Sequence, residues 1–309
     1  MKIVYMGTPD FAVNPLHALA EAGYEVTGVV TQPDKPKGRG KSMLPTPVKE
    51  EALKHGFPVY QPVKVRDPEF LQVLEKLDPD IIVVAAFGQI IPKSILELPK
   101  YGCINIHASL LPKYRGAAPI QQAVIDGEKE SGVTIMRMGT GLDTGDIILQ
   151  SEFALSDEIT AGELHDIMME QGGELLVETI DKIKNNCAPR IPQNDEESSY
   201  APMMNKALGN IDFSKTAKEI HNLVRGVNPW PSAYTTYEGK SMKVWKTKVL
   251  NETTSKECGT ILKVDKDGIR VATKDKILLI EEIQMPNKKR VAVCEYIKGN
   301  KIEEDTILG

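Results

Sequence analysis

The length, composition and charge of the chain describe an ordinary globular protein. Its 309 residues are 41% hydrophobic and 26% charged, which excludes a mainly disordered, collagen-like or coiled-coil chain and allows two domains or one large one. The sequence contains no run of about 18 uncharged apolar residues and opens with no signal peptide, so we expect no membrane segment and a cytoplasmic location. The four cysteines, Cys103, Cys187, Cys258 and Cys294, are scattered without C-x-x-C or Cys/His clustering, so neither disulfides nor a metal site is expected.

The formal charge of −5 is unevenly distributed along the chain. Residues 1–205 carry 19 Lys and Arg against 29 Asp and Glu, whereas residues 206–309 carry 19 against 14, which gives −10 and +5. A basic C-terminal part favours a polyanionic partner such as nucleic acid, although a solvated lysine-rich surface explains the charge equally well.

The first part of the chain alternates short apolar strands with helical patterns. The expected strands are Lys2–Met6, Val26–Val30 and Ile81–Ala86, and the expected helices are Phe11–Ala22, Val48–His55 and Pro68–Leu77. This alternation predicts an α/β, Rossmann-like fold, with a mostly parallel sheet, helices on both faces and a ligand site at the carboxyl ends of the strands. The loop Gly7–Asp10 lacks the G-x-G-x-x-G fingerprint, so a dinucleotide site is weakly supported.

Later segments divide the chain into two domains. A helical pattern over Gly162–Lys184, with an expected interruption at Gly172-Gly173, closes the first domain. We place that domain at 1–186, an exposed linker at 187–205 and a second domain at 206–309. The second domain begins with a helix and continues with short strands, which favours a small OB-like β-barrel. Its expected elements are Thr216–Arg225, then Ala233–Tyr237, Lys243–Lys248, Gly259–Val264, Gly268–Ala272 and Lys276–Glu282.

Two motifs carry candidate chemistry. Cys103–His107 alternates polar and apolar residues, so Asn105 and His107 project from the same face of a strand. A loop containing Ser109-Leu110-Leu111-Pro112 follows at once, and a glycine-rich loop, Gly139–Asp146, follows later. Taken singly, a histidine on a strand is more often structural than catalytic, and Gly/Asp loops are usually turns.

Together the motifs are specific. The run N-x-H-x-S-L-L-P-x-Y-R-G-x-x-P, followed by G-x-D-x-G-D, closely resembles the formyltetrahydrofolate-dependent formyltransferase family. The resemblance implies that the chain moves a formyl group from 10-formyltetrahydrofolate to an amine and releases tetrahydrofolate. It implies that Asn105, His107 and Asp143 are catalytic. It also implies that two segments contact the folate: Phe87, Gly88, Gln89 and Ile90, and Ser109, Leu110, Leu111 and Pro112.

Physical chemistry makes this catalytic trio sensible. Attack of an amine on the formyl carbon builds a tetrahedral intermediate, and donors at its anionic oxygen stabilise it. Asn105 and a protonated His107 are the expected donors. The Asp143 carboxylate would favour the protonated ring and accept the proton that the amine loses, directly or through a water. No covalent enzyme intermediate is needed.

A basic segment, residues 32–49, points to the acceptor of the formyl group. It carries five basic residues and one acid and follows the second expected strand, so it lies at the sheet edge that holds the site. Such a long loop without secondary structure is usually functional or disordered, and its charge suits phosphate. The segment resembles an insertion by which tRNA-formylating members of the family reach the acceptor arm of initiator methionyl-tRNA. The residues expected to contact tRNA are Lys35, Lys37, Arg39 and Lys41, with Arg39 the strongest candidate.

Other functions are weighed against this one. Members that formylate aminosugar nucleotides would not need the basic segment, and members that formylate glycinamide ribonucleotide would leave 206–309 unexplained. A non-catalytic RNA-binding protein is opposed by the intact Asn105, His107 and Asp143. A dinucleotide-dependent oxidoreductase is opposed by the missing glycine fingerprint. We expect no membrane partner and no obligate protein partner.

Overall fold

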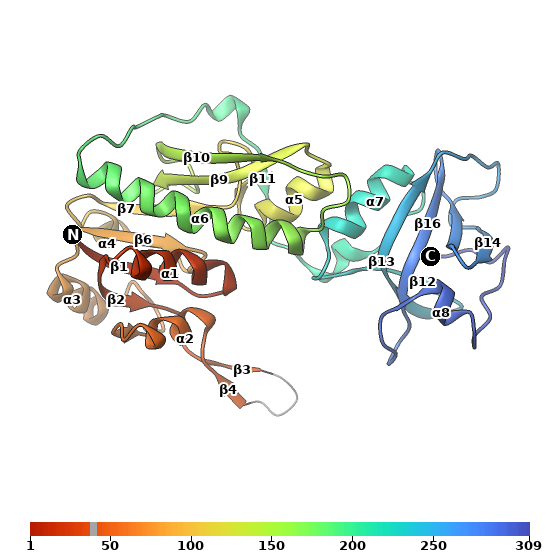
Figure 1. Ribbon diagram of the computed structural model, residues 1–309, viewed down its shortest axis with the longest axis horizontal. Coiled ribbons are helices and arrows are strands. Elements are labelled where there is room, and N and C mark those ends of the chain that lie inside the picture. Colours follow the sequence, from red (N-terminus) through yellow and green to blue (C-terminus); the bar gives the residue numbers. More distant parts are fainter. Residues whose placement is uncertain (38–41) are drawn as a thin grey trace. The chain divides into compact units, whose positions relative to one another are not determined.

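The computed structural model describes residues 1–37 and 42–309, which form two compact units (Figure 1). Unit 1 comprises Met1–Gly116, Glu130–Ala154 and His165–Ala201, and unit 2 comprises Ala117–Lys129, Leu155–Leu164 and Pro202–Gly309. The units therefore interleave along the chain. The boundaries drawn from the sequence, at 186 and 206, stay a prediction of where independently folding domains begin and end.

Unit 1 is built on a seven-stranded sheet. In spatial order its strands are β10 (Ile147–Ala154), β9 (Glu130–Arg137), β7 (Cys103–His107), β6 (Ile81–Ala85), β1 (Lys2–Gly7), β2 (Glu25–Val30) and β5 (Val59–Tyr60). The strands from β7 to β5 are mutually parallel, whereas β9 runs antiparallel to β7 and β10 antiparallel to β9. The expected mostly parallel sheet is thus confirmed.

Helices cover both faces of this sheet. Those of unit 1 are α1 (Val13–Glu21), preceded by the 3-10 turn η1 (Asp10–Ala12), α2 (Pro47–Lys54), α3 (Pro68–Leu77), α4 (Lys93–Leu96) and most of α6 (Ala161–Lys184). Apolar side chains of α3 and α4 share a core with Met6 and Val84 on one face. On the other face α6 packs against Ile106 and Val133, and Figure 1 shows α1 beside α6. Because helices cover both faces, the ends of the strands are where the connecting loops lie.

The helix α6 is continuous, so the expected interruption at Gly172-Gly173 is wrong. Both glycines instead allow the helix to pack closely. A Cβ on Gly172 would lie 3.3 Å from Cγ2 of Ile106, and one on Gly173 would lie 2.4 Å from Oδ1 of Asn14. Glycine in a helix costs up to about 1 kcal/mol relative to alanine, and close packing on the sheet and on α1 outweighs that preference here.

Smaller elements complete unit 1. They are β3 (Lys35–Lys37), β4 (Ser42–Leu44), β8 (Arg115–Gly116), η2 (Asp195–Glu197) and β11 (Tyr200–Ala201). The strands β3 and β4 pair with each other in antiparallel register, and β8 pairs with β11 in parallel. The second pairing brings the end of the expected linker against the loop that follows β7.

Unit 2 combines helices with an antiparallel sheet. Its strands are β12 (Ala233–Tyr237), β13 (Lys240–Leu250), β16 (Ile277–Gln284), β15 (Gly268–Ala272) and β14 (Ile261–Asp265) in spatial order, with β17 (Val291–Ala292) also paired to β16. The remaining elements are α5 (Pro119–Asp126), η3 (Lys206–Gly209), α7 (Ala217–Gly226) and α8 (Val293–Tyr296). The bounds of β12 and β15 are those expected from the sequence, whereas β17 and α8 were not expected.

A single apolar core holds unit 2 together. Ile220 and Val224 of α7 are buried with Val244, Ile269 and Ile280 of the sheet. The helix begins with a reciprocal capping box between Thr216 and Glu219, which satisfies donors that would otherwise lack partners at its first turn. Among the helices of the described residues, none is long and apolar enough to cross a membrane.

Candidate active site

The strand β7 positions the first two predicted catalytic residues. Asn105 pairs with Val84 of β6 and Met136 of β9, and His107 lies opposite Thr134 of β9. Because side chains alternate along a strand, Asn105 and His107 share a face, as expected. His107 is only 5% exposed, whereas Asn105 is half-buried. The asparagine is therefore the member of the pair that solvent reaches more easily.

The imidazole of His107 lies between a carbonyl and a carboxylate. Its Nε2 lies 2.9 Å from the carbonyl oxygen of Tyr114, an acceptor, so Nε2 carries a proton and donates it. Its Nδ1 lies 3.7 Å from Oδ2 of Asp143. That distance is too long for a hydrogen bond, so the two groups face each other and each can still bond to a third group.

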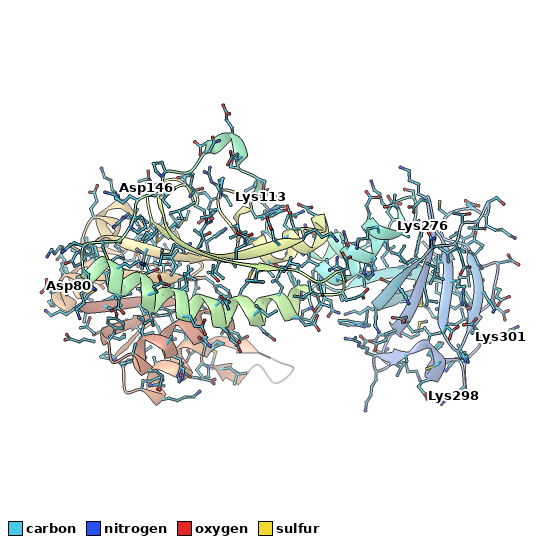
Figure 2. The ribbon with its side chains drawn as sticks, turned by 45° about the horizontal axis from the view of Figure 1, so that its top comes forward. Asp80, Lys113, Asp146, Lys276, Lys298 and Lys301 are labelled. Carbon is cyan, nitrogen blue, oxygen red and sulfur yellow. The ribbon has the colours of Figure 1, made fainter. Side chains whose placement is uncertain are left out.

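A left-handed backbone presents Asp143. Its φ is +52°, a conformation that Asp and Asn adopt more readily than most residues. Its Oδ2 accepts a hydrogen bond from the backbone N–H of Gly116 at 2.9 Å. The structure thus brings Asn105, His107 and Asp143 to one place, with the first two on a strand and the third in a loop. Lys113 and Asp146, labelled in Figure 2, belong to the two loops that meet here.

Gln193 joins the same two loops and was missed by the sequence analysis. Its side-chain amide donates to the backbone carbonyls of Asp143 at 2.8 Å and Gly145 at 2.7 Å. Its Oε1 accepts from Nε and Nη2 of Arg115 at 3.0 and 2.8 Å. The segment expected to be only an exposed linker therefore supports the candidate site, and no sequence signal marks Gln193 because its partners are mainly backbone groups.

The neighbouring residues tie that segment to the loop after β7 as well. Oγ of Ser199 accepts a hydrogen bond from the backbone N–H of Tyr114 at 2.8 Å. The backbone carbonyl of Ser199 accepts one from the backbone N–H of Arg115 at 2.9 Å. Nη2 of Arg115 also lies 2.8 Å from Oδ1 of Asp195. Residues 193–201 thus hold the two loops of the candidate site in place through hydrogen bonds.

The predicted folate segment 109–112 is fixed by side chains from the two antiparallel strands. Thr134 of β9 donates from Oγ1 to the carbonyl of Ser109 at 2.6 Å and accepts from the N–H of Leu111 at 3.1 Å. Gln150 of β10 donates to the carbonyl of Leu111 at 3.0 Å. Ser109 is buried and its hydroxyl donates to the carbonyl of Lys113, so the backbone of this segment is held on several sides.

The second predicted folate segment, 87–90, lies at the end of β6. Thr8 and Gln32 donate side-chain hydrogen bonds to the carbonyl of Phe87 at 3.0 and 3.2 Å. The side chain of Ile90 is among the most exposed apolar groups described, at 92%. Gln32 and residues 88–90 line a pocket of about 360 Å³ together with residues 63–66. An apolar side chain so exposed beside a pocket is a suitable contact for a flat ring.

The predicted tRNA-contacting residues are only partly described. Arg39 and Lys41 lie outside the described residues. Lys35 is exposed on β3, and Lys37 ends that strand. The sequence analysis treated the segment as a loop without secondary structure, but two of its parts, β3 and β4, pair as antiparallel strands. Lys49, the last basic residue of the segment, forms an ion pair with Asp34 at 2.7 Å.

The strand β13 gathers cations on one face of unit 2. Its register shifts between Val244 and Thr247, so Lys243, Lys246 and Lys248 are all exposed although their spacing breaks strict alternation. These three lysines therefore lie on the exposed side of the strand.

An aromatic ring lies within this lysine face. The indole of Trp245 carries the ammonium of Lys243 at 5.5 Å and the guanidinium of Arg290 at 5.0 Å from the ring centroid. Such a surface suits a polyanion, because it concentrates positive charge on one strand.

Two other features are excluded from the chemistry. Burial raises the pKa of the Cys103 thiol to about 12, so this cysteine stays protonated and is no nucleophile.

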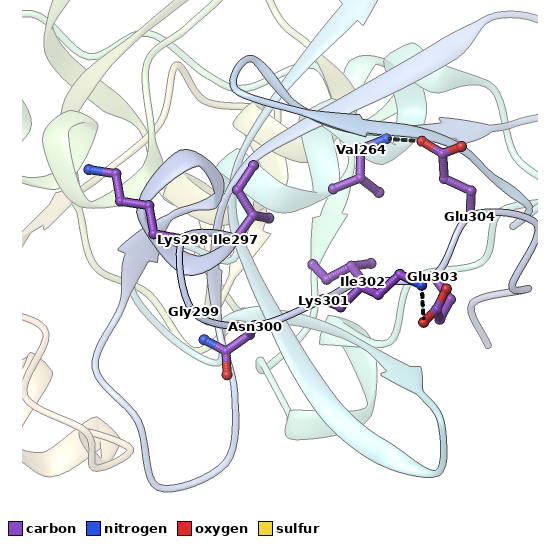
Figure 3. A pocket seen from close by; sticks show the side chains of 9 residues that line it. All are labelled: Val264, Ile297, Lys298, Gly299, Asn300, Lys301, Ile302, Glu303 and Glu304. Atoms are coloured by element: carbon purple, nitrogen blue, oxygen red, sulfur yellow. Dashed lines mark hydrogen bonds and ion pairs between the residues drawn. The ribbon is translucent and has the colours of Figure 1, made fainter.

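A pocket of about 730 Å³ in unit 2 is lined by Val264 and residues 297–304 (Figure 3). Its charges are mixed, with Lys301 paired to Glu303 at 2.9 Å, and nothing in it resembles a site for an anionic ligand.

Comparison with known proteins agrees with the motifs. Residues 1–180 match the formyl transferase family model, and residues 203–301 match the formyl transferase C-terminal domain. The methionyl-tRNA formyltransferases of Clostridioides difficile (strain 630) and Clostridium novyi (strain NT) are 65% and 55% identical to this chain. Each alignment covers 100% of both chains. A sugar 3N-formyl transferase solved in the presence of dTDP and 5-N-formyl-THF superimposes with a TM-score of 0.68 at 25% identity, over 94% of this chain and 99% of its own. The chain belongs to the formyl transferase family.

Proposed function

We infer that this chain transfers the formyl group of 10-formyltetrahydrofolate to the amino group of methionyl initiator tRNA. The products are tetrahydrofolate and N-formylmethionyl-tRNA, with which translation begins. The observation that carries this inference is the set of methionyl-tRNA formyltransferases that are 52 to 65% identical to the chain over its whole length. Initiator tRNA is charged and used in the cytoplasm, so we place the protein there.

Asn105, His107 and Asp143 are proposed to perform the transfer. The lone pair of the amine attacks the formyl carbon, and the carbonyl electrons move to an oxygen that becomes anionic. The side-chain amide of Asn105, the more accessible of the two β7 residues, donates to that oxygen. Collapse of the intermediate breaks the bond to N10 of the folate, and the proton that the amine gives up is returned to N10 as it leaves, directly or through a water.

The bonds of His107 assign different tasks to its two nitrogens. Nε2 donates to the carbonyl of Tyr114, which leaves Nδ1 to face the reaction. When the ring is protonated, Nδ1–H is the second donor to the developing oxyanion, and Oδ2 of Asp143, 3.7 Å away, balances its charge. The same carboxylate receives the proton from the attacking amine, directly or through a water.

Substrate contacts follow from the surrounding segments. Phe87, Gly88, Gln89 and Ile90, with Ser109, Leu110, Leu111 and Pro112, are proposed to hold the folate. Lys35, Lys37, Arg39 and Lys41 are proposed to contact the acceptor arm of the tRNA. The exposed lysines of β13 would neutralise phosphates elsewhere on the tRNA, because contacts to phosphate need no particular base sequence.

The direct test is formyl transfer from 10-formyltetrahydrofolate to three acceptors. We expect rapid transfer to methionyl initiator tRNA and little to elongator methionyl-tRNA or to a 4-amino-sugar nucleotide. Transfer to the sugar alone would keep the catalytic trio and contradict the tRNA acceptor. Absence of transfer to every acceptor would contradict the folate site itself.

Replacing Asp143 by Asn should remove the proton acceptor and keep the loop. Asn tolerates the left-handed backbone and can still accept from the N–H of Gly116, so we expect kcat to fall by about 10²- to 10⁴-fold. The Kd of tetrahydrofolate, measured by fluorescence titration, should change little. The control is Asp146→Asn in the same loop, whose carboxylate pairs with Arg190 at 3.3 Å. Near-normal turnover in Asp143→Asn would remove Asp143 from the mechanism.

Gln193 should act as a positioning residue for Asp143. Both Gln193→Leu and Gln193→Glu lose the two N–H donors to the Asp143 loop, and Gln193→Glu keeps an acceptor for Arg115. We expect each to lower kcat by about 10- to 100-fold, since misplacement of about 1 Å costs that much, with the KM for folate nearly unchanged.

A matched control for Gln193 is its neighbour. Asn194→Ala removes a cap of η2 and no contact to the Asp143 loop, so its kcat should stay normal. Thermal melting of all three variants separates positioning from unfolding. If Gln193→Glu kept full kcat, the donors to the Asp143 loop would not matter and only the acceptor for Arg115 would.

The lysines of β13 should govern the salt dependence of tRNA binding. A Lys243→Ala/Lys248→Ala variant loses up to two phosphate contacts, so the slope of log K against log salt should become shallower by about 1 to 2. Lys246 is left intact because it pairs with Glu281 at 3.2 Å. The control is Lys298→Ala/Lys301→Ala, labelled in Figure 2, whose lysines pair with Glu295 and Glu303. Equal slopes for both variants would show that the β13 face does not bind the tRNA.

A further inference from the structure

Three potential metal ligands converge where α1 and α2 pack together. His17 lies on α1, Glu51 lies on α2, and His55 follows the last turn of α2. Oε1 of Glu51 is 3.0 Å from Nδ1 of His17 and 3.0 Å from Nε2 of His55. The two ring nitrogens are 3.2 Å apart. Among the described residues, this is the one group of at least three His, Cys, Asp or Glu ligand atoms so close together.

The triangle of donor atoms has the dimensions of a metal site. In a tetrahedral zinc site with bonds of about 2.0 to 2.1 Å, any two ligand atoms are about 3.3 to 3.4 Å apart. The three separations in the structure, 3.0, 3.0 and 3.2 Å, are within a few tenths of an ångström of that value. A cation above the triangle would therefore reach all three atoms at ordinary bond lengths with only small side-chain adjustments.

Hydrogen bonding alone explains this geometry less completely. Oε1 of Glu51 can accept a hydrogen bond from an N–H of each ring, which accounts for the two contacts of 3.0 Å. In that arrangement the N–H groups of His17 and His55 both point at one oxygen atom, and their nitrogens are only 3.2 Å apart. A cation uses the same three atoms as lone-pair donors and removes that crowding.

The surroundings of Glu51 suit a ligand carboxylate. Glu51 is buried, and its second oxygen, Oε2, accepts from the ammonium of Lys54 at 2.9 Å. Ligand carboxylates are commonly held in this way through the oxygen that does not bind the metal.

Space for a fourth ligand lies beside the cluster. The three residues line a pocket of about 490 Å³, together with Asn14 of α1 and Met169 of α6. The pocket is open to solvent, so a water molecule can complete a tetrahedral shell. The donor set of two imidazoles and one carboxylate suits zinc and neighbouring divalent transition metals, and does not suit Mg²⁺ or Ca²⁺.

We propose that His17, Glu51 and His55 form a three-ligand site for a divalent zinc-type cation. His17 binds through Nδ1, His55 through Nε2 and Glu51 through Oε1, and water occupies the fourth position. The ion ties α1 to α2, the helix whose first turn ends the basic segment. The site takes no part in formyl transfer, and it stabilises unit 1 because it binds the folded chain alone.

The test uses the full-length chain without a polyhistidine tag, stripped of metal and titrated with Zn²⁺ against a chromophoric chelator. We expect about one ion per chain, a higher Tm on binding, and a loss of affinity of at least about tenfold in His17→Ala and in His55→Ala. His165→Ala is the matched control, because that histidine is also partly exposed but lies against Asp166 and Phe11, outside the cluster. Lys54→Met should retain binding, because Lys54 holds the oxygen that is not a ligand.

Cobalt substitution separates this site from binding at the cysteines. Cys187 is exposed and Cys258 and Cys294 are partly so, and each can take up zinc adventitiously. Co²⁺ in the proposed site should give visible bands of a tetrahedral nitrogen and oxygen shell without thiolate-to-cobalt charge transfer. Charge-transfer bands, affinity that survives in both histidine variants, or less than one bound ion at micromolar Zn²⁺ would each overturn the proposal. The variants remain informative if formyl transfer is unchanged, since that activity reports correct folding independently.

Discussion

The position of Asp143 depends on hydrogen bonds from two segments that are distant in sequence. Its carboxylate is held by the backbone N–H of Gly116, and its backbone carbonyl by the side chain of Gln193. The left-handed φ of Asp143 costs about 1 kcal/mol or more, which these bonds offset. The loop also crosses the end of β9 so closely that a Cβ on Gly145 would lie 1.7 Å from the carbonyl oxygen of Arg137. The carboxylate can therefore face His107 only when this loop, the loop after β7 and residues 193–201 are all in place.

The parts of the site that follow from local geometry were predictable from the sequence. Strand alternation alone puts Asn105 and His107 on one face, and the order of helices and strands predicts a mostly parallel sheet. The place of Asp143 is not local, because it depends on the return of the chain along β9. The spacing of residues in the sequence does not predict the position of Asp143. Only the resemblance to a family identified Asp143 as a member of the expected trio.

The remaining differences have one physical cause, which is that tertiary contacts outweigh local preference. Gly172 and Gly173 break a helix in isolation, but in α6 they allow close approach to β7 and α1. Gln193 lies in a polar run typical of a solvated linker, and its partners on the Asp143 loop are backbone carbonyls, which leave no trace in a sequence. His17 and Glu51 are 34 residues apart, so no motif joins them before the helices pack. The domain limits are equally non-local, since short segments of unit 2 interrupt unit 1.

The two basic regions are proposed to contribute differently to recognition of a tRNA. Lysines on an exposed strand such as β13 attract the phosphates that every tRNA carries, so they raise affinity without choosing between initiator and elongator. Choice requires groups that sense the acceptor end, where pairing differs and opening a weak terminal pair costs less. The basic segment follows β2, at the edge of the sheet that also carries Asn105 and His107, and its base is anchored by the hairpin of β3 and β4 and by the pair of Lys49 with Asp34. We therefore propose that this segment determines selectivity, and that the proposed catalytic residues Asn105, His107 and Asp143 need only accept an amine that has already been delivered.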